Sequence, residues 1–311
     1  MPAIRFILPL ILLAAACKPA GPPEVVVIPK ASANRFWPEV KAGAEAAGRD
    51  LGVTVRWSSP EQESDRQRQI ELMQEAVSSR AAAIVLAPLD SRSLIPSVKA
   101  ARSRKIPVVI FDSGLDEAVY ASFVGTDNRK AGEACAQHLG VLLAGKGLVA
   151  VLRYQEGSSS TTEREEGFMA AMRAASPGIS LRESPAYSGA SVKSAYEAAR
   201  TLLAGMPEVK GIFCPNETSL TGTLQALEEA GLAGQVALIG FDSNERLLEG
   251  LKRGTVSALL IQDPRAIGYE GVKAAVQALR GQAPAARIET PVLLLTTETL
   301  GDPEIRKRLV F

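Results

Sequence analysis

The stretch IPVVIFDSG (Ile106–Gly114) recurs in the second half of the chain as VALIGFDSN (Val236–Asn244). Shortly before each copy, IVLAPLDSRSL (Ile84–Leu94) recurs as GIFCPNETSL (Gly211–Leu220). Each segment is a short apolar run followed by polar residues, which is typical of a strand buried on both faces and the loop that leaves it. Because the segments come in the same order in both halves, we expect two similar α/β units, with the second beginning near Gly125.

The alternation of strand and helix continues along the rest of the chain. Short apolar runs predict strands at residues 25–28, 53–57, 82–86, 107–111, 148–152, 211–214, 236–241 and 256–261. Helical patterns predict helices at residues 38–50, 65–80, 94–104, 129–143, 162–175, 192–204, 220–230, 245–253 and 264–279. Strands that alternate with helices predict parallel sheets built from right-handed crossovers.

Length, charge and composition limit the possible functions. The 311 residues are consistent with two domains at about 150 residues each. The 35 basic residues balance 34 acidic ones, whereas a nucleic-acid-binding protein usually shows a clustered basic excess. A single histidine and three cysteines leave little material for a protein zinc site. We therefore expect no nucleic-acid partner, no metal and no cofactor.

The first 17 residues read as a leader that is removed from the mature protein. Arg5 is followed by an apolar run from Phe6 to Ala16, which is too short to span a bilayer and is typical of a secretory signal peptide. Three alanines directly precede Cys17, which resembles the bacterial lipoprotein signal and makes Cys17 the expected lipidation site. An ordinary signal peptide is the alternative. Residues 18–24 (KPAGPPE) read as a linker.

Two cysteines remain in the part expected to fold. Cys135 lies in a predicted helix and Cys214 in a predicted strand. Export would permit a disulfide between them, but we interpret them as two buried free thiols.

Polar and aromatic side chains follow the predicted strands. In open parallel sheets, ligands bind at the carboxyl ends of the strands, so two facing units would gather these side chains around one cleft. Planar Asn, Asp, Gln and Arg heads suit the adjacent hydroxyls of a sugar or polyol, and aromatic rings suit its apolar faces. The candidate ligand-binding residues are Lys30, Asn34, Phe36, Trp37, Asp112, Ser113, Thr162, Arg164, Asn216, Asp242 and Gln262.

Several of these residues also have a purely structural interpretation. Thr162 and Asp242 each precede a glutamate by three residues, the spacing of a capping box. Arg164 could pair with a neighbouring glutamate, Lys30 could be solvated, and the aromatic pair could pack into the core. The matching placement of Asp112 and Asp242 favours a ligand role for both aspartates.

Residues 24–311 resemble the ribose-binding-protein branch of periplasmic sugar-binding proteins. The opening VIPKASANRFWPEVKAGAEAAGRDLG has that family's Asn, aromatic pair and first helix, and APLDS, IPVVIFDS, VGTDN, TEREEGF, CPNETSLTGTLQALEEAG, ALIGFDS and IQDPRAIG follow in family order. The resemblance implies the type I periplasmic binding protein fold, with two doubly wound parallel-sheet domains joined by a three-crossover hinge. The N-terminal lobe would comprise residues 25–126 and 263–290, and the C-terminal lobe residues 127–262 and 291–311.

The resemblance also assigns positions in the cleft. Lys30 stands where the ribose-binding branch has Ser, Ala87 where it has Asn, and Ser113 and Thr162 where it has Arg. Because Ser or Thr does not replace a bidentate Arg, ribose is not the expected ligand, and Lys30 could recognise an acidic sugar, a phosphate or another hydroxyl pattern. The positions implied to contact ligand are Asn34, Phe36, Trp37, Asp112, Asn216, Asp242 and Gln262.

The resulting hypothesis is a lipid-anchored, extracytoplasmic solute-binding protein, monomeric and not an enzyme. It captures a sugar by hinge closure and delivers it to the permease of an ABC importer. The alternative is a sensing role, in which the protein presents its ligand to a chemoreceptor or sensor kinase. Asp112 and Asp242 could imitate a glycosidase carboxylate pair, but no other feature supports catalysis. A repressor would need a DNA-binding segment where the leader stands.

Overall fold

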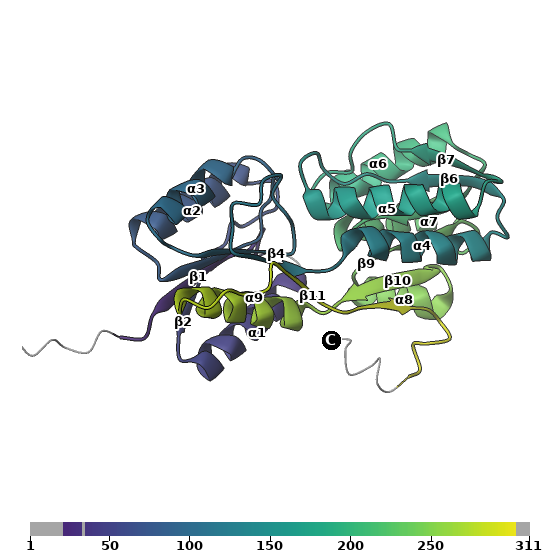
Figure 1. Ribbon diagram of the computed structural model, residues 1–311. Helices are drawn as coiled ribbons and strands as arrows, with labels where there is room; N and C mark the ends of the chain where they lie inside the picture. The colour runs from purple at the N-terminus through teal and green to yellow at the C-terminus, as the bar shows by residue number, and fades with distance from the viewer. Residues whose placement is uncertain (1–20, 33–34, 303–311) are drawn as a thin grey trace, which may run out of the picture.

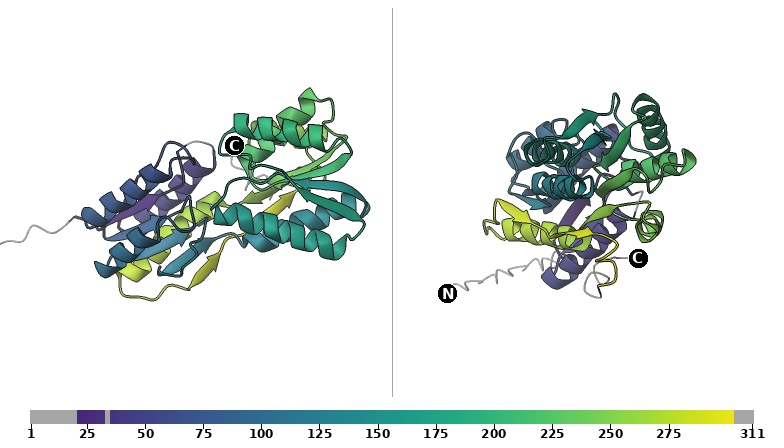
Figure 2. Two further views of the ribbon diagram at one scale, coloured as in Figure 1. Left: turned by 90° about the horizontal axis from the view of Figure 1, so that it is seen from above. Right: turned by 90° about the vertical axis from the view of Figure 1, so that its right-hand side faces the viewer.

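The computed structural model describes residues 21–32 and 35–302, which form two α/β lobes side by side (Figures 1 and 2). The candidate residues Cys17 and Asn34 lie outside these described residues. The predicted α/β class and two-lobe architecture are confirmed, with one six-stranded sheet in each lobe. No helix of the described part is long and apolar enough to cross a membrane.

The N-terminal lobe has a parallel sheet of strand order β11-β5-β4-β3-β1-β2. Helices α1 and α9 cover one face of this sheet, and α2 and α3 cover the other. Its strands are β1 (Glu24–Ile28), β2 (Thr54–Trp57), β3 (Ala83–Leu86), β4 (Val108–Phe111), β5 (Ser122–Gly125) and β11 (Arg287–Glu289). Its helices are α1 (Phe36–Leu51), α2 (Arg66–Ser78), α3 (Ile95–Ser103) and α9 (Pro264–Leu279).

The C-terminal lobe repeats this design in the order β12-β10-β9-β8-β6-β7. Helices α4 and α5 cover one face, and α6, α7 and α8 cover the other. Its strands are β6 (Gly147–Val151), β7 (Ile179–Glu183), β8 (Val209–Cys214), β9 (Ala237–Phe241), β10 (Ala258–Gln262) and β12 (Val292–Leu295). Its helices are α4 (Asn128–Leu142), α5 (Ser159–Ala175), α6 (Val192–Gly205), α7 (Glu217–Glu229) and α8 (Glu245–Arg253).

The chain passes between the lobes three times, from β5 to α4, from β10 to α9 and from β11 to β12. Each passage contributes an element to the lobe that it enters, so neither lobe is continuous in sequence. Cys135 on α4 and Cys214 on β8 are buried free thiols, and they belong to the cores on opposite faces of the sheet.

Some elements differ from the sequence predictions. The sequence patterns did not indicate β5, β7, β11 or β12. Strands β7, β11 and β12 are partly exposed edge strands, and β5 (SFVG) has only two apolar residues between a serine and a glycine. Strand β12 pairs antiparallel with β10, so the C-terminal sheet is parallel except at this edge. Such an edge strand can run either way because it adds to the sheet without a crossover helix.

Glycines let α9 lie directly against α1. A Cβ atom on Gly43 of α1 would lie 2.1 Å from the carbonyl oxygen of Arg265, and one on Gly268 of α9 would lie 1.9 Å from that of Val40. No side chain fits in these gaps, so the two helix backbones are in contact. This contact fixes the helix that begins at the second passage between the lobes.

The C-terminal lobe repeats this contact between α4 and α5. A Cβ on Gly132 of α4 would lie 2.1 Å from the carbonyl oxygen of Arg164, and one on Gly167 of α5 would lie 2.1 Å from that of Arg129. Helix α4 begins at the first passage between the lobes, as α9 does at the second. The close packing therefore holds α5, which carries Arg164, against a helix that begins at a passage between the lobes.

Candidate ligand-binding cleft

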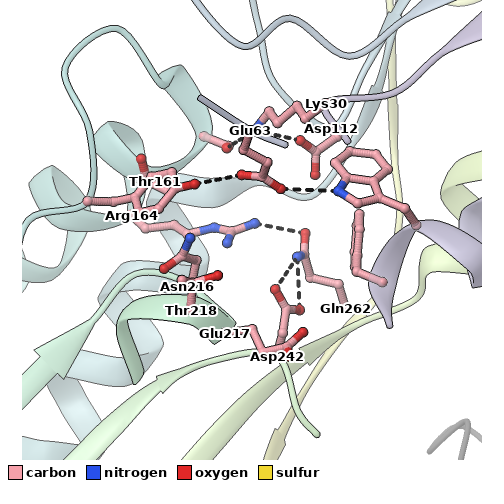
Figure 3. A pocket seen from close by; sticks show the side chains of 14 residues that line it. Lys30, Glu63, Asp112, Thr161, Arg164, Asn216, Glu217, Thr218, Asp242 and Gln262 are labelled. Atoms are coloured by element: carbon pink, nitrogen blue, oxygen red, sulfur yellow. Dashed lines mark hydrogen bonds and ion pairs between the residues drawn. The ribbon is translucent and has the colours of Figure 1, made fainter. Parts of the chain in front are cut away.

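A cleft between the lobes collects side chains from the carboxyl ends of both sheets (Figure 3). This is the edge at which open parallel sheets bind their ligands. Most of the candidate residues that the structure describes line the cleft, whereas Ser113 and Thr162 do not. The lining residues are Lys30, Phe36, Trp37, Glu63, Asp112, Tyr154, Ser160, Thr161, Arg164, Asn216, Glu217, Thr218, Asp242 and Gln262.

The two aspartates of the repeated Phe-Asp-Ser segments occupy equivalent positions. Asp112 follows β4 with φ +62°, and Asp242 follows β9 with φ +64°. The backbone N–H of Asp112 donates to Val124 O, and that of Asp242 donates to Leu260 O, both at 2.9 Å. The left-handed conformation is costly for a residue with a side chain, although Asp tolerates it better than most. Both turns leave their carboxylates on the wall of the cleft.

Lys30 is buried rather than solvated. It is 5% exposed, and its Nζ lies 2.8 Å from Asp112 Oδ2 and donates to Ser160 Oγ at 3.1 Å. Ser113 binds the same serine, since its hydroxyl donates to Ser160 Oγ and accepts from Ser160 N, both at 3.1 Å. Ser113 therefore supports the contact between the lobes behind the cleft.

Arg164 crosses the floor of the cleft from α5 and is 3% exposed. Its guanidinium donates to Asn128 Oδ1 at 2.8 Å, to the Pro215 carbonyl at 2.9 Å and to Gln262 Oε1 at 2.9 Å. It also lies 4.0 Å over the Phe241 ring. Burial lowers the pKa of Arg164, and the charges of nearby aspartates oppose that shift, so the group stays charged. The structure shows no ion pair from Arg164 to a neighbouring glutamate, which corrects that alternative.

Gln262 connects the cleft to the chain passages between the lobes. Its Nε2 donates to both carboxylate oxygens of Asp242, at 3.0 and 3.2 Å. Its Oε1 accepts from Arg164 and, at 2.9 Å, from the hydroxyl of Thr126. Thr126 lies in the first passage between the lobes and Gln262 ends β10 at the second. Hydrogen bonds through Gln262 therefore link Thr126, in the first passage, to Asp242 in the cleft.

The capping-box interpretations of Asp242 and Thr162 are wrong. Asn244 caps α8, with its Oδ1 accepting from Leu247 N at 3.0 Å, so Asp242 is left for the cleft. Burial raises the pKa of Asp242, while Arg164 and the Gln262 hydrogen bond oppose the shift. Helix α5 begins at Ser159, three residues before the predicted start. Thr162 is not among the residues that line the cleft, and Thr161 lines it instead.

Trp37 belongs to both the core and the cleft. It is 2% exposed and makes edge-to-face contacts with Phe36 and Phe111, with ring centroids 5.0 and 6.2 Å apart. Its indole N–H donates to Glu63 Oε1 at 3.1 Å. Phe36 is half-buried at the start of α1 and lines the cleft. The packing and ligand interpretations of the aromatic pair are therefore compatible.

Sequence reasoning missed a bridge between the lobes. Glu63, from the loop between β2 and α2, accepts from the hydroxyl of Tyr154 at 2.7 Å as well as from Trp37. Burial, and then the nearby charge of Glu63, raises the pKa of Tyr154 well above its usual value. Tyr154 could have been predicted, because it closely follows the strand β6. Glu63 could not, because it lies in a polar loop and does not directly follow a strand.

Glu217 was also missed. It is the first residue of α7, next to the cap residue Asn216, whose Oδ1 accepts from Ser219 N at 3.0 Å. Glu217 accepts from Asn244 Nδ2 at 3.0 Å. Burial raises the pKa of Glu217 to about 7, and the charges of Asp242 and Glu63 add to the shift. Its place directly after Asn216 was the signal in the sequence.

Further hydrogen bonds connect the two lobes. Ser91 N donates to the Gly157 carbonyl at 2.9 Å, and Gly114 N donates to Ser159 Oγ at 2.7 Å. With the Lys30 and Tyr154 contacts, these bonds join loops of the N-terminal lobe to the start of α5 and the loop before it.

Comparison with known proteins agrees with this architecture. Residues 25–283 match the family model of the periplasmic binding protein domain. A D-ribose/D-allose-binding protein of Pseudomonas aeruginosa is 30% identical over 289 residues, covering 88% of this chain and 89% of that protein. A carbohydrate transporter solute-binding protein from Agrobacterium radiobacter, solved with D-arabinose, is 31% identical with a TM-score of 0.87, covering 93% and 99% of the two chains. An ABC transporter solute-binding protein from Agrobacterium vitis, solved with D-fucose, is 34% identical with a TM-score of 0.87, covering 92% and 100%.

Proposed function

Because the chain belongs to the periplasmic binding protein family, we propose that its cleft closes over a neutral sugar or polyol and hands it to the permease of an ABC importer. It is a sugar-binding solute-binding protein of the ribose-binding branch, and the family places it in the periplasm. Its relatives are sugar-binding transport proteins rather than enzymes. What we propose beyond this is that the ligand is neutral, that the two lobes close over it, and that a lipid anchors the protein to a membrane.

The observation that carries the proposal is the convergence of planar polar heads from both lobes on one cleft. Asp112 comes from the N-terminal lobe, whereas Arg164, Asn216 and Asp242 come from the C-terminal lobe. Closure removes ligand hydroxyls from water, so each must find a partner in the protein. A ligand that lacks one hydroxyl leaves a buried group unpaired at a cost of about 1–3 kcal/mol, which would produce selectivity.

The charges in the cleft favour a neutral ligand over an acidic one. Four carboxylates line it, those of Glu63, Asp112, Glu217 and Asp242, against two cations. Both cations are bound by the protein itself, Lys30 by Asp112 and Ser160 and Arg164 by three oxygen acceptors. A uronate or sugar phosphate would meet net negative charge in a partly desolvated site. Lys30 is thus better explained as a partner for Asp112 than as a receptor for an anion.

We further propose that the three passages between the lobes act as the hinge and that Cys17 carries a lipid anchor. The Thr126–Gln262 hydrogen bond between two of these passages supports the first idea. The three alanines before Cys17 support the second. Presentation of the loaded protein to a chemoreceptor or sensor kinase remains the alternative. Deleting the permease separates the two roles, since a sensing role would survive that deletion.

A ligand screen by thermal shift, followed by calorimetry, tests the proposal. Neutral pentoses, hexoses and polyols are compared with matching uronic acids and sugar phosphates at the same pH. We expect one or a few neutral compounds to raise the melting temperature and to bind with measurable heat. Tighter binding of a uronate or a sugar phosphate than of its neutral parent would refute the charge argument, and binding by none of the compounds would refute the ligand class.

A further inference from the structure

The end of the N-terminal lobe that is remote from the cleft carries a concentration of positive charge. Strands β1, β3 and β4 begin at this end, and helices α1, α2, α3 and α9 end there, because the helices run antiparallel to the strands. We call this surface the distal basic face. Its exposed cations are Arg49, Arg80, Arg102, Arg104, Lys105 and Arg280.

These cations have no acidic partner in the part of the chain that the structure describes. None of the six forms an ion pair with a residue in the described ranges 21–32 and 35–302. Arg104 donates to the Val77 carbonyl at 3.0 Å and Arg280 to the Leu51 carbonyl at 2.8 Å, and neither acceptor carries a full charge. Glu24, an acid at this end, is already paired with Arg56 at 2.9 Å.

Helix dipoles alone do not explain this charge. Cations stabilise helix C-termini, so the matching end of the C-terminal lobe should be equally basic if that were the reason. There, α7 ends with Glu228 and Glu229 instead. Arg253 at the end of α8 lies 3.7 Å from Glu228, and Lys252 lies 3.8 Å from Glu249. That end of the C-terminal lobe has three exposed cations that form no ion pair with a described residue, Lys146, Arg173 and Lys210, against six at the distal basic face. The positive charge is therefore more concentrated on the N-terminal lobe.

The chain enters the fold at this same face. Strand β1 begins at Glu24, at the end of the lobe turned away from the other lobe (Figure 1). The Glu24 carbonyl accepts from Ala82 N at 2.9 Å. Ala82 also lines a surface hollow together with Arg80, Arg104 and Lys105. The cations thus lie beside the point where the linker of residues 18–24 joins the lobe.

We propose that the distal basic face lies against the anionic phospholipid headgroups of the membrane that carries Cys17, an inference that rests on the proposed lipid anchor. The seven linker residues reach at most about 25 Å when extended, so the face stays close to the bilayer. Guanidinium groups bind phosphate oxygens through paired N–H donors. A lipid chain combined with a polybasic patch gives two membrane signals on one protein. Contact through this face leaves the cleft, at the opposite end of the strands, open to the periplasm.

The test uses the full chain, purified from its own host membrane and reconstituted in vesicles. A dye at Ser103→Cys, on an exposed site of the distal basic face, reports energy transfer to a headgroup dye in the bilayer. Vesicles of phosphatidylcholine are compared with vesicles that also contain phosphatidylglycerol. We expect stronger transfer with phosphatidylglycerol, and loss of the difference in 1 M salt, where the Debye length is about 3 Å.

Variants that remove positive charges test whether the distal basic face makes the contact with the bilayer. Arg80→Gln/Arg104→Gln/Lys105→Gln should reduce the population in contact with the bilayer about 100-fold, since each charge near an anionic surface contributes about fivefold. Arg80→Gln/Lys105→Gln, which keeps the Arg104 hydrogen bond, should give about a 25-fold reduction on the same basis. The matched control Arg173→Gln/Arg182→Gln/Lys193→Gln makes the same change of charge on exposed residues of the other lobe and should leave the transfer unchanged.

Four results would overturn the inference. The first three are equal transfer on both kinds of vesicle, an equal loss in the control variant, and preferential binding of the face to an acidic polypeptide with no bilayer contact. The fourth is a protein that floats with neither kind of vesicle in a flotation assay, since it would have no lipid anchor and the inference rests on that anchor. Sugar affinity, measured on the same samples, is expected to be unchanged by every variant, so failure here and failure of the proposed function are distinguishable.

Discussion

At the scale of single residues, the repeated Phe-Asp-Ser segment places Asp112 and Asp242 at equivalent positions in the two lobes. Both follow an apolar strand and a phenylalanine, both have left-handed backbone, and both place a carboxylate at the cleft. Their partners differ, however. Asp112 is neutralised by Lys30 at 2.8 Å, whereas Asp242 receives hydrogen bonds from Gln262. Within the described part of the chain, Asp242 therefore has no direct ion-pair partner, and both of its oxygens accept from the same amide.

Replacing Asp242 by Asn should separate binding from stability. Loss of a charged acceptor should weaken sugar binding by roughly 10- to 100-fold, because a hydrogen bond to a charged group contributes about 1.5–3 kcal/mol. Burial raises the pKa of Asp242, so its ionised form is held at a cost in the folded protein, and the neutral Asn should keep or raise the melting temperature. Calorimetry and thermal unfolding check the two expectations, and unchanged affinity would remove Asp242 from the binding site.

The raised pKa of Glu217 predicts that the free energy of unfolding depends on pH. Its pKa is raised from 4.5 to about 7 in the folded protein, so the folded state holds this proton more tightly than the unfolded chain. The resulting stability is fully present below pH 4.5 and is lost as the pH rises to about 7, by on the order of 3 kcal/mol. Glu217→Gln should abolish this share of the decline.

The measurement for Glu217 is urea unfolding of both proteins between pH 5 and pH 8. The stability of the variant relative to the parent should increase with pH across this range. Glu208→Gln, a change at an exposed glutamate of the same lobe, serves as the control and should track the parent. A pH-independent difference between the Glu217 variant and the parent would contradict the assignment.

At the scale of elements, the glycine contacts between helices set the position of Arg164. Gly132→Ala would place a methyl group 2.1 Å from the Arg164 carbonyl, so α4 and α5 must separate. Overpacking of this kind costs about 1–3 kcal/mol, and a displaced Arg164 should also weaken sugar binding. Gly205→Ala at the end of α6 meets no atom within 4 Å and is the matched control. Equal denaturation midpoints for the two variants would disprove the contact.

Much of the element pattern could be predicted from the sequence. Helices α8 and α9 have the predicted bounds, because their apolar stripes and first residues are unambiguous. The edge strands β7, β11 and β12 were not predicted, since half-exposed strands lack a continuous apolar run. The sequence also contains a repeat that the predictions did not use, Asp-x-Arg-x-x-Gly at residues 127–132 and 263–268. It stands at the start of both helices that begin at a passage between the lobes.

The site residues that directly follow a strand could be predicted from the sequence. Lys30, Asp112, Asn216 and Asp242 all follow a predicted strand closely, and all line the cleft. Glu63 could not be found in this way, because its position depends on how a long loop packs against the other lobe. Thr162 was misplaced for a related reason, since the start of α5 depends on a loop that carries several possible caps.

At the scale of the whole molecule, the Glu63–Tyr154 hydrogen bond at 2.7 Å joins the two lobes directly. Tyr154→Phe removes this bond while keeping the ring in its buried place. The closed state should lose about 0.5–1.5 kcal/mol, or more because Glu63 is charged. Single-molecule energy transfer between dyes on the two lobes should show a larger open fraction without sugar. An unchanged open fraction would show that this bond does not hold the lobes together.

The most direct test of the central claim is a crystal structure with the neutral sugar that binds best in the ligand screen. The account predicts one sugar molecule enclosed between the lobes, with hydroxyls bound by Asp112 from one side and by Arg164 and Asp242 from the other. It also predicts an apolar face of the sugar against Phe36 or Trp37. A sugar bound outside this cleft, or contacted by only one lobe with the lobes closed, would contradict the account.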